Sequence, residues 1–359
     1  MPTRYLYGTV LTGEAVAANN RGDNLGNTTT LQKVFVGDDL HTSVSAEALR
    51  FAFRYRFQLQ GLKVNRRYIT QVGEDYGPKD LYTLRYADEK HTAWRSEDPD
   101  PYVDDDLMGF MNAEAAKQEQ ESDDTGGEVA EKEAEAETIP SAKAEGKDNK
   151  AKDKPIKPKK PKGTTNKRQS PLAVGRAVSL RPYRGEISFN CVSGAKEEGA
   201  LSLYAAEMHT TEYQYTFALN MNDVVNKANI AHLIGAIVDP PPVAGNHSRF
   251  SYDFSPASVI FRLTTCHSPK IQNCFEHDEE TRTYSLARLI QRVECGDVPA
   301  TELVVGGLVA STEFGRRLGK AGARVFPGVL QASQEIQLRV AAFGPPFGAA
   351  SKNGEEAQP

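Results

Sequence analysis

Side chains near the start of the chain alternate between two kinds of position, as they do in a β-strand. Tyr5, Tyr7, Thr9 and Leu11 occupy every second position. This pattern predicts a strand over 5–18. A polar, turn-rich loop follows it, with the sequence NNRGDNLGNTTT.

The segment from Ser45 to Leu59 fits two different periods. One set of apolar residues shares a helical face: Ala48, Phe51, Ala52, Tyr55 and Leu59. A second set alternates with polar residues, as in a strand: Phe51, Phe53, Tyr55, Phe57 and Leu59. The cap decides between them, because Ser45 is a good N-cap and Glu47 lies in the first turn, where the helix dipole favours an acid. We therefore predict a helix.

Further along, strands and helices mix without a strict βαβ repeat. Strands are predicted at HTTEYQYTFALNM, at SVIFRLTTC and at the final QEIQLRVAAF. Between the first two, Asn222 is the predicted cap of a helix, DVVNKANIAHLIGAIV, which a Pro-Gly turn ends. The mixture indicates the α+β class.

Residues 113–168 differ from the rest of the chain in composition. They are rich in Glu, Lys, Ala, Pro and Gly, with acidic residues concentrated in the first half and basic residues in the second. Such a segment buries too little apolar surface to offset its ordering entropy, so we predict a disordered charged insertion. The alternative is a tail that binds RNA through its Lys-Pro block, KDKPIKPKKPKG.

Composition narrows the classes of function. The chain of 359 residues has four cysteines and a net charge of -5. So few cysteines fit a reducing cytosol, and the acidic balance means that any nucleic-acid function must rest on a local basic surface. No apolar run is long enough for a membrane helix, and the start, MPTRYLYGTV, has no pattern of a secretory signal. We expect a cytoplasmic protein.

The first candidate for that basic surface lies between Ala48 and Gly73. This stretch contains six basic residues and no acidic one: Arg50, Arg54, Arg56, Lys63, Arg66 and Arg67. Aromatic residues lie between them. Guanidinium groups bind phosphates bidentately and aromatic rings stack on bases, but an amphipathic element with a solvated face would look the same. Lys33 and the hydroxyls of Thr28, Thr29 and Thr30 could add donors to a site for a nucleic-acid backbone.

Two further segments carry convergent polar residues. The turn AGNHSRF offers donors from Asn246, His247 and Arg249, although a capped surface turn explains it equally well. The glycine-rich piece VVGGLVASTEFGRRLGKAGARVF is no P-loop, but its Arg316, Arg317 and Lys320 could form a basic loop against a nucleic-acid backbone.

Signals for a metal or for catalysis are weak. Cys266, His267, Cys274 and His277 match no common zinc spacing, and buried thiols explain the cysteines. Asp104, Asp105 and Asp106 could bind a divalent ion, yet a triple Asp is usually just solvated. We predict no cofactor, no metal and no enzymatic activity.

Taken in order, several segments resemble the DevR-type CRISPR-associated proteins. The strand and loop with Asn19, Asn20 and GNTTT, followed by VSAEALRFAFR, resemble the opening of that family. DDDLMGFM resembles its acidic-Leu-Gly-Phe motif, and KRQSPLAVGRAVSL its Arg-x-Ser-Pro-Leu segment. EMHTTEYQYTFALN and AGNHSRFSYDFSPASVIFR resemble a strand and a Gly-Asn-His-x-Arg turn with its following strand. The match covers most of residues 5–265.

The resemblance implies the repeated backbone subunit of a type I Cascade, with an RRM-like (ferredoxin-like) palm and finger and thumb insertions. It implies that several copies bind along the crRNA spacer while the guide pairs with target DNA. Other Cascade subunits, a large subunit and a crRNA-handle-binding subunit, are implied partners. On this reading, 1–112 holds the first half of the palm and the fingers, and 169–359 the second half of the palm, the thumb and the C-terminal strands.

The same resemblance implies RNA contacts at residues that match the family's motifs. These are Asn19, Asn20, Ser45, Arg50 and Arg54, with the turn Asn246, His247 and Arg249 as a second contact. Two rival functions stay open. Related type III subunits cut target RNA with a loop aspartate, for which Asp23, Asp38 or Asp39 are candidates, and the family's name suggests a transcriptional autoregulator.

Overall fold

The computed structural model describes residues 4–18, 20–95, 100–113, 165–191, 203–243, 252–278, 280 and 283–342. The chain separates into two compact units, one made of 1–110 with 167–359 and the other of 111–166. The first unit holds nearly all the described residues. The predicted insertion lies largely outside the described residues.

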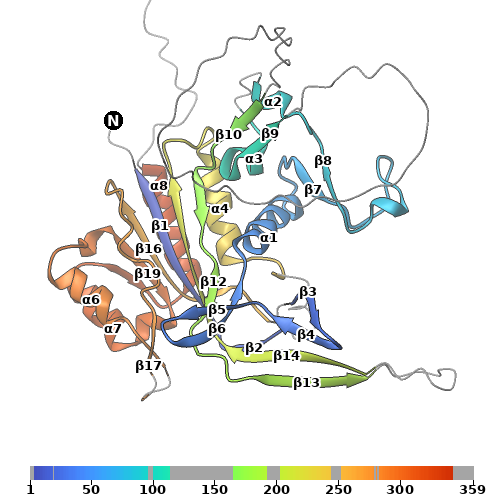
Figure 1. Ribbon diagram of the computed structural model, residues 1–359. Helices are drawn as coiled ribbons and strands as arrows, with labels where there is room; N and C mark the ends of the chain where they lie inside the picture. The colour runs from blue at the N-terminus through green and yellow to red at the C-terminus, as the bar shows by residue number, and fades with distance from the viewer. Residues whose placement is uncertain are drawn as a thin grey trace, which may run out of the picture. The chain divides into compact units, whose positions relative to one another are not determined.

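A nine-stranded sheet forms the centre of the described part of the first unit (Figure 1). Its strand order is β20-β19-β16-β1-β15-β12-β6-β5, and β11 pairs separately with β15. The bounds are β1 (Tyr5–Thr12), β5 (Lys33–Val36), β6 (Asp39–Val44), β11 (Leu172–Val174), β12 (Ala177–Ser179), β15 (Tyr213–Asn220), β16 (Pro256–Thr264), β19 (Leu303–Gly307) and β20 (Arg324–Phe326). Strand β1 pairs antiparallel with both β15 and β16, and only β19 with β20 is parallel among these pairs.

Helices cover both faces of this sheet. The larger core lies against α1 (Ala46–Leu59), α4 (Ala228–Val238) and α8 (Val329–Ala342). The second core lies on the other face, against α6 (Ala287–Glu294), α7 (Glu313–Lys320) and the short helices η2 (Ala300–Glu302) and η3 (Leu308–Ser311). Strand β1 is buried on both faces because it lies between the two cores. The α+β class predicted from the sequence is confirmed.

A five-stranded sheet lies next along the chain, and its strand β14 leads directly into the start of β15. It contains β2 (Ala15–Ala17), β3 (Asn20–Leu25), β4 (Thr28–Leu31), β13 (Glu186–Cys191) and β14 (Leu203–Thr211). Strands β13 and β14 pair over Glu186–Met208 to Cys191–Leu203 and extend as a hairpin at the lower right of Figure 1. The side chains of Ile187 and Phe189 on this hairpin are exposed, Phe189 at 85 %.

Shorter elements lie between α1 and β11. They are β7 (Arg66–Tyr68), η1 (Pro78–Asp80), β8 (Leu84–Tyr86), α2 (Thr92–Arg95), α3 (Val103–Met108), β9 (Phe110–Ala113) and β10 (Thr165–Arg168). The remaining pair, β17 (Glu276–Asp278) and β18 (Thr283–Ser285), precedes α6. Within the described residues, no helix is both long and apolar enough to cross a membrane.

Three sequence predictions about local structure are wrong. The predicted final strand, QEIQLRVAAF, is wrong, because its residues 334–342 belong to α8, where Ala332, Ile336 and Val340 are buried at helical spacing while Leu338 is 69 % exposed. The helix predicted after Asn222 begins only at Ala228, and its N-cap is Lys227. The glycine-rich basic segment is not a loop, since it forms β19, η3, α7 and β20.

Candidate nucleic-acid interface

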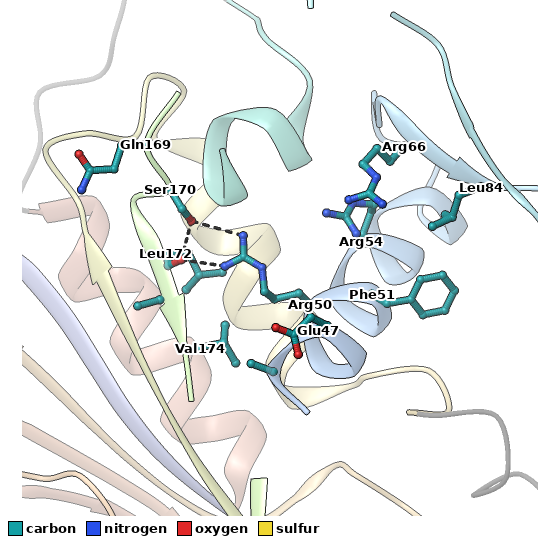
Figure 2. A pocket seen from close by; sticks show the side chains of 12 residues that line it. Glu47, Arg50, Phe51, Arg54, Arg66, Leu84, Gln169, Ser170, Leu172 and Val174 are labelled. Atoms are coloured by element: carbon teal, nitrogen blue, oxygen red, sulfur yellow. Dashed lines mark hydrogen bonds between the residues drawn. The ribbon is translucent and has the colours of Figure 1, made fainter. Parts of the chain in front are cut away.

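A groove of about 740 Å³ lies between α1 and the segment that leads into β11 (Figure 2). We call it the α1 groove. It is lined by Ala46, Glu47, Arg50, Phe51, Arg54, Arg66, Leu84, Gln169, Ser170, Leu172, Ala173 and Val174. Three of these residues are arginines and one is acidic, so the groove is electropositive and suits an anionic ligand.

The local sequence explains how α1 presents its side chains. Ser45 has extended backbone angles, and its hydroxyl accepts a hydrogen bond from the Ala48 N–H at 3.2 Å, so the predicted N-cap is confirmed. Phe53 and Phe57 are fully buried in the larger core. Burial of this face turns Glu47 and Arg50 toward the groove.

Arg50 connects α1 to the opposite wall of the groove. Its Nη1 donates to the Leu172 carbonyl at 3.1 Å, and its Nη2 to the Met108 carbonyl at 2.7 Å. Figure 2 shows the guanidinium pointing from α1 toward Ser170 and Leu172. Burial lowers the pKa of Arg50, and Glu47 opposes that shift. Arginine stays protonated in proteins at neutral pH, so Arg50 gives the groove a cation.

Arg54 lines the same groove, but its side chain is buried, although the sequence predicted an RNA contact there. Only 8 % of the residue is exposed, and its Nε donates to Asp104 Oδ2 at 3.2 Å. Burial lowers its pKa, while Asp104 raises it. Arg54 therefore supports the groove from behind and offers little surface to a ligand.

Arg66 is the third arginine of the groove, and the sequence did not single it out from the basic stretch. It begins β7, and its Cζ lies 5.4 Å from the ring centroid of Tyr86 on the paired strand β8. Its Nε is buried and has no hydrogen-bond partner among the described residues. The residue as a whole is only partly buried and lines the groove, and a guanidinium held over a ring is well suited to bind an oxyanion.

Three aromatic residues of the basic stretch, Phe51, Tyr55 and Tyr68, pack against one another. The Phe51 and Tyr68 rings meet edge to face with centroids 5.1 Å apart, and Tyr55 meets Tyr68 at 5.5 Å. These contacts attach β7 to the outer side of α1. They place Arg66 at the groove.

The three aspartates of α3 are buried, so the expectation that they are solvated is wrong. Asp104 accepts from the backbone N–H groups of Asn65 and Arg66 at 2.7 and 3.0 Å. Asp106 is fully buried and accepts from Arg168 Nη2 and from the Val225 N–H, both at 2.8 Å. The two carboxylates thus fix both walls of the groove, since one holds β7 and the other holds the segment that ends at Arg168.

Asp105, between them, pairs with a histidine. Its Oδ2 lies 2.8 Å from His91 Nδ1, and the His91 ring stacks on Phe110 at 3.6 Å between centroids. Burial raises the pKa of Asp105 to about 6, and Asp104 adds to that rise. Every carboxylate of this triplet is therefore engaged by protein donors.

Gly109 ends α3 where no other residue fits without strain. Its φ is +64°, in the left-handed region, and a Cβ there would lie 2.7 Å from the Ser170 nitrogen. The glycine lets the end of α3 approach the 168–170 segment closely. This contact brings the Met108 carbonyl within reach of Arg50.

The groove therefore unites three segments that are far apart in the sequence. They are VSAEALRFAFR, DDDLMGFM and KRQSPL, three of the segments on which the resemblance rested. Ser170 closes the arrangement, because its hydroxyl donates to the Leu172 carbonyl at 2.6 Å next to Arg50.

Other predicted contacts lie elsewhere. Lys33 on β5 pairs with Glu207 of β14 at 2.5 Å. Arg316 donates to the Ser311 carbonyl, and Arg317 pairs with Glu294. Both belong to α7 with Lys320, across the sheet from α1. Four predicted contacts lie outside the described residues: Asn19, Asn246, His247 and Arg249. The side chain of Asn20 is not described either.

Among the other candidates for catalysis or for a metal, Asp38, Asp39, Cys266 and Cys274 do not line the groove. Asp38 and Asp39 are exposed at the turn between β5 and β6, and the side chain of Asp23 is not described. Cys274 is buried, whereas Cys266 is exposed. Within the described residues, no group of three or more His, Cys, Asp or Glu side chains is arranged to hold a metal ion.

The fold and the groove define an α+β protein with an arginine-lined groove. The model of the family described as CRISPR-associated negative auto-regulator DevR/Csa2 matches residues 10–284. A Myxococcus xanthus (strain DK1622) protein described as CRISPR-associated protein Cas7/Cst2/DevR is 35 % identical over 344 residues, which cover 94 % of this chain and 97 % of that protein. The chain belongs to the DevR/Csa2 family, which confirms the resemblance.

A solved structure has a similar fold. It is a chain of a CRISPR RNA-guided surveillance complex, in a state described as pre-nicking, with 12 % sequence identity and a TM-score of 0.55. The match covers 94 % of this chain and 99 % of that chain. At this identity the likeness concerns the fold.

Proposed function

We propose that this protein is a crRNA-binding backbone subunit of a type I CRISPR Cascade, which coats the guide spacer in several copies. The observation that carries the proposal is the α1 groove, where three family-like segments meet around Arg50 and Arg66. The arginines of the groove would bind the phosphates of the crRNA backbone whatever its sequence, while the guide itself selects its target by base pairing.

The strand order supports an RRM-like palm. Taken in chain order, β1, α1, β11 with β12, β15, α4 and β16 form a βαββαβ series. In space the strands run β16-β1-β15 and then β11 or β12, with neighbouring strands antiparallel. Both helices belong to the same core. This is the order of a ferredoxin-like unit.

Two insertions into that series suit the implied fingers and thumb. The fingers correspond to the elements between α1 and β11, including β7, β8 and α3. The thumb corresponds to the β13–β14 hairpin, which interrupts the connection between β12 and β15. Its exposed Phe189 and Ile187 give it an apolar surface that a partner or a base can cover.

The partners follow from this role. They are the crRNA, target DNA through the guide, further copies of this chain, and the large and crRNA-handle-binding subunits of Cascade. The net charge of -5 is compatible with RNA binding because only one face of each subunit carries the groove.

A non-enzymatic role predicts that the protein retains RNA without cutting it. We expect a labelled RNA complementary to the bound guide to stay full length in the presence of magnesium. The measurement is the length of the RNA on a denaturing gel over time. Regularly spaced cleavage that disappears on changing Asp23, Asp38 or Asp39 would instead establish the endoribonuclease alternative. Binding confined to one DNA operator sequence would favour the autoregulator.

A further inference from the structure

Tyr82 lies at one end of the β7–β8 ribbon in a backbone conformation that disfavours its side chain. Its φ is +63°, in the left-handed region, where a bulky residue is strained and glycine is not. Hydrogen bonds fix that conformation, because the Tyr82 N–H donates to the Ile69 carbonyl at 2.6 Å and the Thr83 N–H to the Asp80 carbonyl at 3.1 Å. The turn therefore explains the left-handed conformation, but not the tyrosine.

The Tyr82 side chain makes no contact that would offset this strain. It is 72 % exposed, and within the described part of the chain its hydroxyl forms no hydrogen bond and its ring no aromatic or cation contact. The other described non-glycine residues in this conformation differ: His91 is buried and pairs with a carboxylate, Lys270 forms a surface ion pair, and Asn273 is of a type that tolerates it. Strain at an exposed side chain without a partner points to a ligand.

The ribbon that carries Tyr82 is basic and aromatic. Its paired positions, RRY in β7 and LRY in β8, hold three arginines, two tyrosines and no acidic residue. The Ile69 N–H donates to the Thr83 carbonyl at 3.0 Å, so Tyr82 adjoins the last pair of this ladder. Leu84, two residues further on, lines the α1 groove (Figure 2). Two residues of extended chain span about 7 Å, so a nucleotide bound in the groove can reach Tyr82 with its base.

Arginines next to exposed rings are typical of surfaces that hold single-stranded nucleic acid. In such surfaces the cations bind the backbone while the rings stack on the bases. Every base has a π-face, so stacking on a tyrosine tolerates any sequence. This suits a subunit that holds guides of any sequence.

We propose that Tyr82 stacks on a base of the RNA whose backbone lies in the α1 groove. The inference rests on the proposed function of the groove. The hydrogen bonds of the turn hold the backbone of Tyr82 in its strained conformation before RNA binds, which reduces the entropy lost on binding.

The test compares two short strands of about ten nucleotides, one an RNA with its bases and the other an abasic RNA with the same sugar-phosphate backbone. Tyr82→Leu keeps an apolar side chain but removes the ring. We expect it to weaken binding of the strand with bases about tenfold, the effect of losing one stacked base, and to change the affinity for the abasic strand by less than about twofold. Tyr82→Phe keeps the ring and should bind both strands as the wild-type protein does.

Tyr82→Gly separates binding from folding. Glycine adopts the left-handed conformation without strain, so the thermal midpoint should fall by no more than about 2 °C. The strand with bases should still bind about tenfold more weakly than it does to the wild-type protein. A larger fall in the midpoint would show that the ring supports the fold, and would overturn the inference.

Phe35→Leu is the matched control. Phe35 is also an exposed aromatic residue, at 77 %, but it does not line the groove, so both affinities should stay unchanged. If Tyr82→Leu weakens both strands equally, or neither, the inference is overturned while the proposed function stands. A loss confined to the assembly of several copies on a long strand would assign Tyr82 to a contact between subunits and overturn it too. A wild-type protein that binds no RNA would overturn the proposed function itself.

Discussion

Replacing Arg66 with glutamine is expected to weaken the binding of single-stranded RNA by about tenfold. Its guanidinium lies over Tyr86, and the residue is partly exposed where it lines the groove, so it is placed to bind a phosphate. Losing one phosphate contact also reduces the dependence of log affinity on log salt by about 0.7. Combining Arg66→Gln with Arg50→Gln should double that change in slope and weaken binding about a hundredfold.

The neighbouring Arg67 provides the control. It pairs with Arg85 across the β7–β8 ribbon, so its side chain lies on the opposite face from Arg66. Arg67→Gln removes the same charge one residue away and should change affinity by less than about threefold. Titrations of a labelled RNA at several salt concentrations measure both quantities. Equal slopes for the Arg66 and Arg67 variants would mean that the α1 groove does not hold the RNA backbone.

Replacing Asp106 with alanine is expected to lower the free energy of unfolding by about 3–5 kcal/mol. The carboxylate is fully buried and accepts from Arg168, from the backbone of Val225 and Asn226, and from the Asn229 amide. Alanine leaves these donors without their partner in a buried site. Asp106 also holds Arg168, two residues before Ser170 in the groove wall. We therefore expect Asp106→Ala to weaken RNA binding as well as to destabilise the protein.

Urea denaturation of the Asp106→Ala protein measures this loss. Asp38→Ala is the comparison, because Asp38 is exposed at a turn and its removal should change the free energy of unfolding by no more than about 0.5 kcal/mol. A loss below about 1 kcal/mol at Asp106 would show that α3 does not anchor the groove.

Local signals predicted the elements whose caps and periods are plain in the sequence. Ser45 fixed the helix over 46–59 even though the same residues also fit a strand period. The alternation at the start of the chain predicted β1 well, but the strand ends at Thr12, because the chain turns at Gly13 and Glu14 before β2.

Other features depend on contacts that the sequence does not display. The segment QEIQLRVAAF looked like a strand because α8 begins at Val329, five residues before that segment. The aspartates of α3 looked solvated because their partners, such as Arg54 and Arg168, come from distant segments. Burial of a charge is decided by such partners, which no local pattern reveals.

The candidate site was predictable in part. Arg50 follows from the basic stretch and the helix, and the Arg-x-Ser-Pro-Leu segment pointed to Ser170 and Leu172 without placing them next to it. Arg66 was one of six basic residues with nothing to set it apart. Its position depends on the pairing of β7 with β8 and on the contact of Tyr68 with α1.

The most direct test of the central claim is what the expressed protein carries when it is purified. A backbone subunit that uses one face for RNA and its flanks for further copies gains avidity along a strand. We therefore expect a high ratio of absorbance at 260 nm to that at 280 nm, and a multimer that nuclease or high salt reduces in size. A monomer free of nucleic acid that also fails to join its Cascade partners would contradict the account.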